Sequence, residues 1–230
     1  MRTNNVDRWV REAVQIDAGD QCLHGNLCIP PHAKGLIAFV HGSGSSRFST
    51  RNLFVAEFLN ERGFATLLFD LLSSSEEQID NLTARYRFDI SLLSRRVLHA
   101  TEWIQNDQRT KQLSIGYFGA STGAAAALVS ASRLGAAVKA VVSRGGRPDL
   151  ASGYLSGVTC PTLFLVGERD SEVLKLNLKT LSLLPETTVK EIEIVPDATH
   201  LFEEPGALAV VANAAARWFK AYLSGKKNGS

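Results

Sequence analysis

Short apolar runs alternate with helix-length amphipathic segments along most of the chain. Six runs from Gly35 onward read as strands, and helical patterns follow nearly all of them. Strands buried on both faces are apolar throughout, because crossover helices cover both sides of a parallel sheet. The pattern therefore predicts an α/β fold with a mostly parallel sheet and helices on both faces. The expected strands are 35–40, 64–70, 113–119, 138–143, 161–167 and 189–195; the expected helices are 51–62, 89–106, 121–134, 171–184 and 205–223.

The two ends of this series have different patterns. A strand through Val14 and Ile16, a polar turn at 17–20 and a second strand at 22–29 predict an antiparallel start. The run 189–195 alternates, with two isoleucines on one face and two glutamates on the other, as expected of an edge strand with one wet face.

The number of predicted strands and helices corresponds to a single domain. Neither an internal repeat nor a low-complexity linker interrupts it, so we expect a single domain over residues 1–223 and a flexible C-terminal tail at 224–230. The segment 71–78, which follows the strand 64–70, is expected to be a loop at the rim of a site.

The charge and hydrophobicity of the chain exclude several classes of binding partner. The 230 residues are 45% hydrophobic and 21% charged, with a net charge of +2 and no long block of one sign. Nucleic acid and acidic membranes are therefore not expected as partners. The apolar runs fall far short of the roughly 20 residues that span a bilayer, and the N-terminus has no signal-peptide pattern.

The cysteines indicate the cellular compartment, and the glycine-rich segments lack the known phosphate-binding motifs. Three cysteines, an odd count, predict buried structural thiols in a reducing compartment, and hence a cytoplasmic protein. Neither glycine-rich segment contains Gly-Lys-Ser/Thr or a complete Gly-x-Gly-x-x-Gly, and no metal-ligand spacing is present. We expect neither a cofactor nor a metal.

The most informative segment is Gly119-Ala120-Ser121-Thr122-Gly123, which lies between a predicted strand and an Ala-rich helix. Gly-x-Ser-x-Gly in this setting is typical of a nucleophile elbow, a sharp turn that exposes the serine hydroxyl. The glycines permit close approach of strand and helix, and the helix N-terminus favours developing negative charge. Ser121 is therefore the candidate nucleophile.

A serine nucleophile needs a base and an acid. His200 is the only histidine after Ser121, and it lies in the loop between the edge strand and the last helix. Asp170, after the strand 161–167, is the expected acid that orients His200, although it could instead cap the following helix. Three other carboxylates remain as weaker alternatives: Asp149, then Glu168 and Asp197.

The oxyanion of an acyl-transfer intermediate needs two backbone donors. We expect them to be the N–H groups of Thr122 and Ser43, the latter in the loop after the strand 35–40. Gly42 allows the backbone to approach a substrate, and His41 is expected to shape this loop.

Two arginines follow the strand 138–143. Arg144 is a candidate for a substrate carboxylate; the alternative for Arg144 and Arg147 is a structural pair with a nearby aspartate.

These motifs together resemble the α/β-hydrolase fold family, most closely its dienelactone-hydrolase-like branch. The segments FVHGSGSSR, LLFDLL, VVSRGGRPDLA and THLFEEPG carry the resemblance over nearly the whole chain. It implies an eight-stranded sheet whose second strand is antiparallel, and an esterase mechanism with Ser121, Asp170 and His200. Dienelactone hydrolases proper use a cysteine nucleophile and a glutamate after the third strand. This chain has Ser121 and no such glutamate in HGSGSS, which argues against dienelactone as its substrate.

In this fold, lids commonly insert after the sixth strand. Only 17 residues separate the runs 138–143 and 161–167, so we expect no cap domain and an open, shallow site. The expected function is a serine carboxylesterase for short-chain or small aromatic esters, acting as a monomer or homodimer. A non-catalytic binding protein of the same fold remains the alternative, as do thioesterase, perhydrolase or lactone hydrolase chemistry on the same residues.

Overall fold

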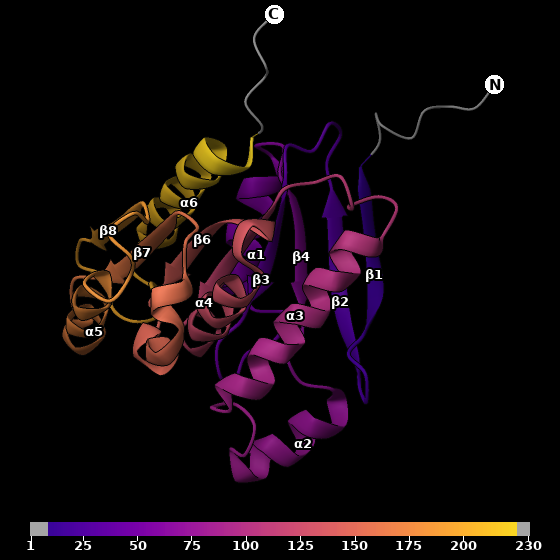
Figure 1. Ribbon diagram of the computed structural model, residues 1–230, viewed down its shortest axis with the longest axis horizontal. Coiled ribbons are helices and arrows are strands. Elements are labelled where there is room, and N and C mark those ends of the chain that lie inside the picture. The colour runs from indigo at the N-terminus through magenta and orange to yellow at the C-terminus, as the bar shows by residue number, and fades with distance from the viewer. Residues whose placement is uncertain (1–8, 225–230) are drawn as a thin grey trace, which may run out of the picture.

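The computed structural model describes residues 9–224, which form one eight-stranded sheet flanked by helices (Figure 1). Its order is β1-β2-β4-β3-β5-β6-β7-β8. β2 pairs antiparallel with β1 and β4, and all other neighbours are parallel. The strands are β1 (Val10–Asp17), β2 (Cys22–Ile29), β3 (Leu36–Val40), β4 (Ala65–Phe69), β5 (Ile115–Ala120), β6 (Val138–Arg144), β7 (Thr162–Gly167) and β8 (Lys190–Val195). The predicted sheet and its antiparallel start are confirmed. Nearly all of the predicted tail lies outside the described residues.

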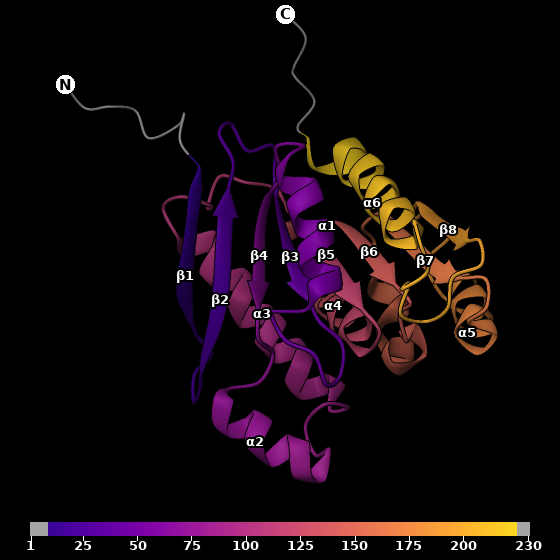
Figure 2. The same ribbon diagram turned by 180° about the vertical axis from the view of Figure 1, so that it is seen from behind.

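Helices cover both faces of the sheet, as the two opposite views show (Figures 1 and 2). One face carries α1 (Thr50–Asn60) and α6 (Ala207–Leu223); the other carries α3 (Ile90–Asn106), α4 (Thr122–Leu134) and α5 (Ser171–Leu181). Consecutive residues of β3 enter opposite cores: Ile37 and Phe39 pack on the α1–α6 side, Ala38 and Val40 on the other. This double burial explains why the central strands are apolar throughout.

β8 is the edge strand that the sequence predicts, but its apolar face is only partly covered. Ile192 packs against the core, whereas Ile194 is 44% exposed. Glu193, on the opposite face, is held by Arg217 of α6 at 2.9 Å. The alternating pattern predicted that both isoleucines face the core, but only Ile192 is covered. An edge strand has a neighbouring strand on one side only, so part of its apolar face stays exposed.

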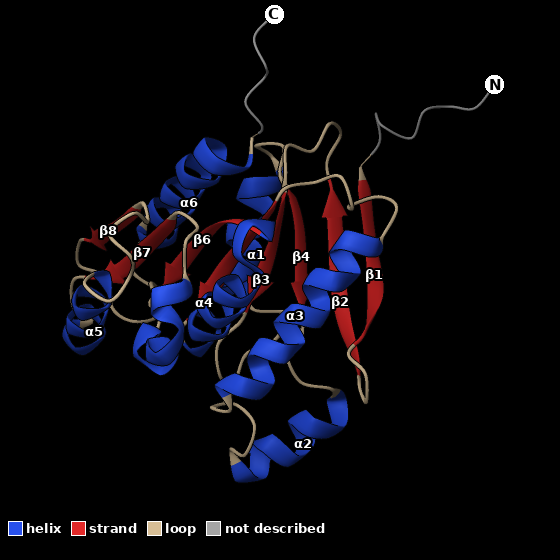
Figure 3. Ribbon diagram, in the orientation of Figure 1, coloured by secondary structure: helices blue, strands red, loops and turns tan. Residues whose placement is uncertain are grey.

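The prediction of a loop at 71–78 is wrong, because α2 (Ser74–Thr83) begins there (Figure 3). A capping box starts the helix: Ser73 Oγ accepts the N–H of Glu76 at 3.3 Å, and Glu76 Oε2 accepts the N–H of Ser73 at 2.8 Å. The other oxygen of Glu76 pairs with the buried Arg96 of α3 at 2.8 Å, which fixes α2 to the body of the protein.

The 17 residues between β6 and β7 form only the short helical turn η3 (Pro148–Gly157), and a single turn η2 (Gly135–Ala137) precedes β6. The described residues therefore contain no cap domain at this position, as predicted.

The prediction that the cysteines are buried is correct only for Cys160, since Cys28 is half-buried and Cys22 is exposed at the start of the outer strand β2. Cys22, Cys28 and Cys160 are free thiols, and burial raises the pKa of Cys160 to about 11. Among residues 9–224, no helix combines the length and apolarity required to cross a bilayer.

Candidate active site

Ser121 lies on a sharp turn between β5 and α4, with φ 51° and ψ −122°. This conformation is strained for a residue with a side chain, and such strain clusters at functional sites. The flanking glycines explain how the turn is built. A Cβ on Gly119 would lie 2.5 Å from Cα of Ala124, and one on Gly123 would lie 2.2 Å from the carbonyl oxygen of Val40. The strand-turn-helix geometry predicted for this segment is present.

His200 lies in the loop after β8 and joins two groups that are far apart in the sequence. Its Nδ1 lies 2.6 Å from Oδ2 of Asp170, and its Nε2 lies 3.4 Å from Oγ of Ser121. Asp170 makes no side-chain cap to α5, so its carboxylate is directed to the imidazole instead. The side chain of Asp170 is 13% exposed and that of His200 is 38% exposed, so the imidazole can meet a substrate.

The alternative carboxylates are engaged elsewhere. Asp149 forms a bidentate pair with Arg147, at 2.9 and 2.8 Å. Glu168 accepts the backbone N–H of Asp197 at 2.9 Å, and Asp197 pairs with Arg169 at 2.5 Å. The contacts of Glu168 and Arg169 with Asp197 join the loop that carries Asp170 to the loop that carries His200.

The loop that carries His200 is also held from its far side. Oε1 of Glu204 accepts both the hydroxyl and the N–H of Thr199, and this hydroxyl bond is the main reason that the pKa of Glu204 lies below its ordinary value. Phe202 has a positive φ of 57° and is fully buried. A buried aromatic anchor and a short polar brace therefore position the imidazole.

The loop after β3 lies directly against the nucleophile. A Cβ on Gly42 would meet Cβ of Ser121 at 3.0 Å, so glycine at this position lets the loop lie close to the nucleophile. The N–H of Ser43 has a partner that the sequence did not indicate: it donates to Oγ1 of Thr122 at 2.9 Å. The backbone N–H of Thr122 lies in the first turn of α4, next to Ser121.

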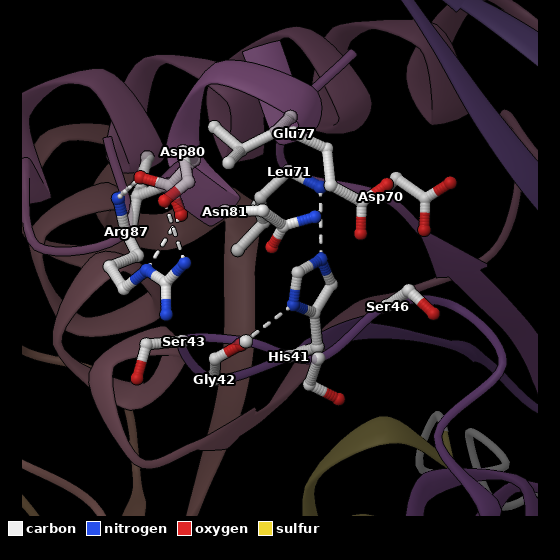
Figure 4. Close-up of a pocket in the computed structure, with 14 residues that line it drawn as sticks. His41, Gly42, Ser43, Ser46, Asp70, Leu71, Glu77, Asp80, Asn81 and Arg87 are labelled. Atoms are coloured by element: carbon white, nitrogen blue, oxygen red, sulfur yellow. Dashed lines mark hydrogen bonds and ion pairs between the residues drawn. The ribbon is translucent and has the colours of Figure 1, made fainter. Parts of the chain in front are cut away.

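His41 is buried and shapes this loop, as predicted (Figure 4). Its Nε2 accepts the N–H of Leu71 at 3.0 Å, and its Nδ1 lies 2.9 Å from the carbonyl oxygen of Gly42. These partners fit a neutral imidazole with its proton on Nδ1. Burial lowers the pKa of His41, which keeps the ring neutral.

A pocket opens between this loop and α2. Its lining includes the apolar side chains of Leu71, Leu72 and Leu93. Polar residues of α2 and the following turn also line it, among them Glu77, Asp80, Asn81 and Arg87 (Figure 4). It shares the loop residues 41–46 with the site but not Ser121 or His200. The unpredicted helix α2 therefore forms one wall of a pocket next to the loop 41–46.

Asp80 and Arg87 link α2 to the turn that follows it, and no sequence pattern singled out either residue. Asp80 accepts the N–H groups of Tyr86 and Arg87 at 2.6 and 3.0 Å, and Nε of Arg87 at 2.7 Å. Burial alone would raise the pKa of Asp80, but these bonds outweigh it and lower the pKa. The only sequence signal was an aspartate near the end of a polar segment.

Arg144 does not lie where a substrate carboxylate would meet it. Its side chain is buried under the His200 loop, over the ring of Phe202 at 5.7 Å and 3.3 Å from Oδ1 of Asn52. Burial lowers its pKa to about 10, and the nearby Arg51 adds to this effect. Arg144 therefore supports the loop, whereas Arg147 makes the predicted pair with Asp149.

No group of three or more His, Cys, Asp or Glu side chains within residues 9–224 is arranged to hold a metal ion. The chemistry available at this site is that of a serine hydroxyl, an imidazole and a carboxylate in series.

Comparisons with known proteins identify the family and the fold. A protein of Mycobacterium tuberculosis, provisionally named a phosphoribosyl transferase, is 50% identical over 93% of this chain and 47% of its own length. The chain thus spans about half the length of this relative. The structure of a dienelactone hydrolase from Anabaena variabilis superposes with a TM-score of 0.91 at 51% identity, over 94% of this chain and 99% of that one. Est1E from Butyrivibrio proteoclasticus shares the fold, with a TM-score of 0.76 at 16% identity over 91% of this chain and 98% of its own.

The family model for the dienelactone hydrolase family matches residues 25–225, which include the elbow, both flanking loops and the His200 segment. The chain belongs to the dienelactone hydrolase family.

Proposed function

We propose that the protein is a serine hydrolase that cleaves carboxylic esters through an acyl-enzyme on Ser121. One observation carries the proposal: Asp170, His200 and Ser121 form a continuous series of contacts at 2.6 and 3.4 Å, with the serine on a strained turn at a helix N-terminus. Such a series activates a hydroxyl that is otherwise a weak nucleophile.

The reaction follows from these positions. Asp170 keeps the proton of the imidazole on Nδ1, so Nε2 of His200 is free to take the proton of Ser121 as Oγ attacks the ester carbonyl. The carbonyl π electrons move to oxygen, and the oxyanion lies near the N–H of Thr122 at the positive end of α4.

Collapse of this intermediate breaks the bond to the alcohol, which leaves with the proton from His200. Water then attacks the acyl-enzyme, again giving its proton to Nε2, and the acid is released as Ser121 recovers its proton. Bonds and protons balance without a cofactor.

The substrates proposed are short-chain and small aromatic esters. No cap domain lies between β6 and β7 in the described chain, and the adjoining pocket is bounded by Leu71, Leu72 and Leu93; both features suit a small group rather than a long lipid. Lactones are a second candidate, because a lactone is a cyclic ester opened by the same steps and the Anabaena relative is named a dienelactone hydrolase.

The test is turnover of p-nitrophenyl esters from acetate to decanoate by wild type, Ser121→Ala and Ser152→Ala. Ser152 is an exposed serine of η3 and serves as the matched control. We expect Ser121→Ala to lose at least about 10⁴-fold in kcat with unchanged folding, and Ser152→Ala to match wild type.

A fluorophosphonate probe followed by mass spectrometry should label Ser121 in wild type. Retained turnover in purified Ser121→Ala would refute the proposal. A wild-type protein that neither hydrolyses any of these esters nor accepts the label would refute it equally.

A further inference from the structure

The N–H of Ser43, the expected second oxyanion donor, points at a side chain instead of open space. It donates to Oγ1 of Thr122 at 2.9 Å, across 79 positions of sequence. Ser43 itself is exposed, whereas Thr122 is 2% exposed. The N–H of Ser43, which was expected to donate directly to the oxyanion, thus already donates to a buried side chain.

The hydroxyl of Thr122 has a proton to give. A threonine hydroxyl has one donor and two acceptor positions, and the bond from Ser43 uses one of the acceptor positions. No acceptor for the hydroxyl proton is found among residues 9–224. A buried donor normally has a partner, so this one is free for an acceptor that arrives with the substrate.

The position of Thr122 defines which acceptor that is. Thr122 is the first residue of α4 and immediately follows the nucleophile. The loop that reaches its hydroxyl also touches Ser121, since a Cβ on Gly42 would lie 3.0 Å from Cβ of Ser121. The loop that donates to the hydroxyl of Thr122 therefore also borders the side chain that attacks the carbonyl.

We propose that the γ-hydroxyl of Thr122 is a catalytic donor to the oxyanion, backed by the N–H of Ser43. This inference rests on the proposed function and deepens it. The oxyanion accepts two hydrogen bonds from one residue, from its N–H and its Oγ1–H, and Ser43 acts through Oγ1 instead of directly. No proton is transferred in these bonds.

Two physical effects favour this arrangement. An N–H bond to a hydroxyl oxygen polarises the hydroxyl and strengthens the bond that it donates. Burial of Thr122 places its donor in a low-dielectric environment, where a hydrogen bond to a developing charge is worth more than in water. The loss of one such donor typically lowers kcat by about 10²–10³-fold.

The test compares Thr122→Val, Thr122→Ser and Thr180→Val. Valine keeps the shape of threonine and removes the hydroxyl, and serine restores the hydroxyl. Thr180 is a buried threonine of α5 whose hydroxyl bonds only to the carbonyl oxygen of Leu176 at 2.9 Å, so it controls for loss of a buried hydroxyl elsewhere.

We expect Thr122→Val to lose about 10²-fold or more in kcat with KM within about threefold of wild type, and Thr122→Ser to stay within about tenfold. Thr180→Val should match wild type in both constants.

A second readout separates a catalytic donor from a structural contact. A trifluoromethyl ketone adds to Ser121 and forms a hemiketal oxyanion, whereas the product acid binds without one. In Thr122→Val, Ki for the ketone should rise by the same factor as kcat/KM falls, and Ki for the product acid should stay unchanged.

A kcat of Thr122→Val equal to or higher than that of wild type would overturn the inference. It would mean that the freed N–H of Ser43 serves the oxyanion directly. Thr122→Ser as slow as Thr122→Val would also overturn it. Both results leave the proposed function standing. If wild type neither turns over esters nor accepts a fluorophosphonate, the proposed function fails and the inference fails with it.

Discussion

Replacing Gly123 by alanine tests whether the contact between α4 and β3 sets the geometry of the elbow. The new Cβ would lie 2.2 Å from the carbonyl oxygen of Val40 and 2.3 Å from that of His41. Ordinary carbon-to-oxygen contacts begin near about 3.3 Å, so the helix N-terminus must move by about 1 Å. Both oxygens belong to the backbone and cannot rotate away.

The expected effect on stability follows from this displacement. Overpacking costs about 1–3 kcal/mol or more, and the better helix propensity of alanine recovers at most about 1 kcal/mol. We expect a net loss of about 2 kcal/mol, which in a domain of this size corresponds to a fall in Tm of about 4–8 °C. Because Thr122 moves with the helix, kcat should also fall by about 10²-fold, as it does when reacting groups are misplaced by 1 Å.

The measurement is thermal unfolding together with ester turnover for Gly123→Ala and a matched control, Gly153→Ala. Gly153 lies in η3, and nothing lies within 4 Å of the position that its Cβ would take. The control should stay within about 0.5 kcal/mol of wild type. Wild-type Tm and kcat in Gly123→Ala would show that the contact between helix and strand yields easily, and would refute this reasoning.

Three further predictions address the base, the loop and the added helix. Asp170→Asn should lose about 10³–10⁴-fold in kcat, because the imidazole of His200 loses the partner that fixes its tautomer. The control Asp149→Asn should keep the kcat of wild type. Equal kinetics in the two variants would contradict the assignment of Asp170 as the acid. Since burial lowers the pKa of His41, the unfolded chain binds a proton below about pH 6.5 that the folded chain does not, so the free energy of unfolding should fall on acidification from pH 7 to 5. Urea unfolding should show a shallower fall in His41→Asn, and an unchanged slope would count against the buried neutral ring. Ser73→Ala removes half of a capping box and should destabilise α2 by about 1 kcal/mol; hydrogen exchange at α2 that does not accelerate would show that the cap is dispensable.

Local pattern was enough for most of the architecture. Apolar strands separated by amphipathic helices predict the parallel sheet, because each strand must bury both faces and each helix one. The elbow was equally readable, because Gly-x-Ser-x-Gly between a strand and a helix is a local pattern, although the contacts that require Gly123 are with the remote Val40 and His41. The polar segment 71–78 was misread, although Ser73 and Glu76 have capping-box spacing; its helix is almost entirely polar and only Asp80 is buried.

The local sequence pattern did not determine which side chains contact each other in the site. Four carboxylates follow the elbow at plausible positions, and only the fold shows that Asp170 faces His200 while the other three bind neighbouring groups. The burial of Arg144 likewise depends on α1 and the His200 loop, which are remote in the sequence.

The sequence by itself determined the layered α/β architecture, the strained serine and the order in which nucleophile, acid and base occur. The tertiary structure alone decided which side chains meet: Asp170 with His200, His41 with Leu71, and Ser43 with Thr122. The physical reason is range. Periodicity and turn sterics act between near neighbours in the chain, whereas these hydrogen bonds join groups about 30 to 79 positions apart that only the packed sheet brings within 3 Å of each other.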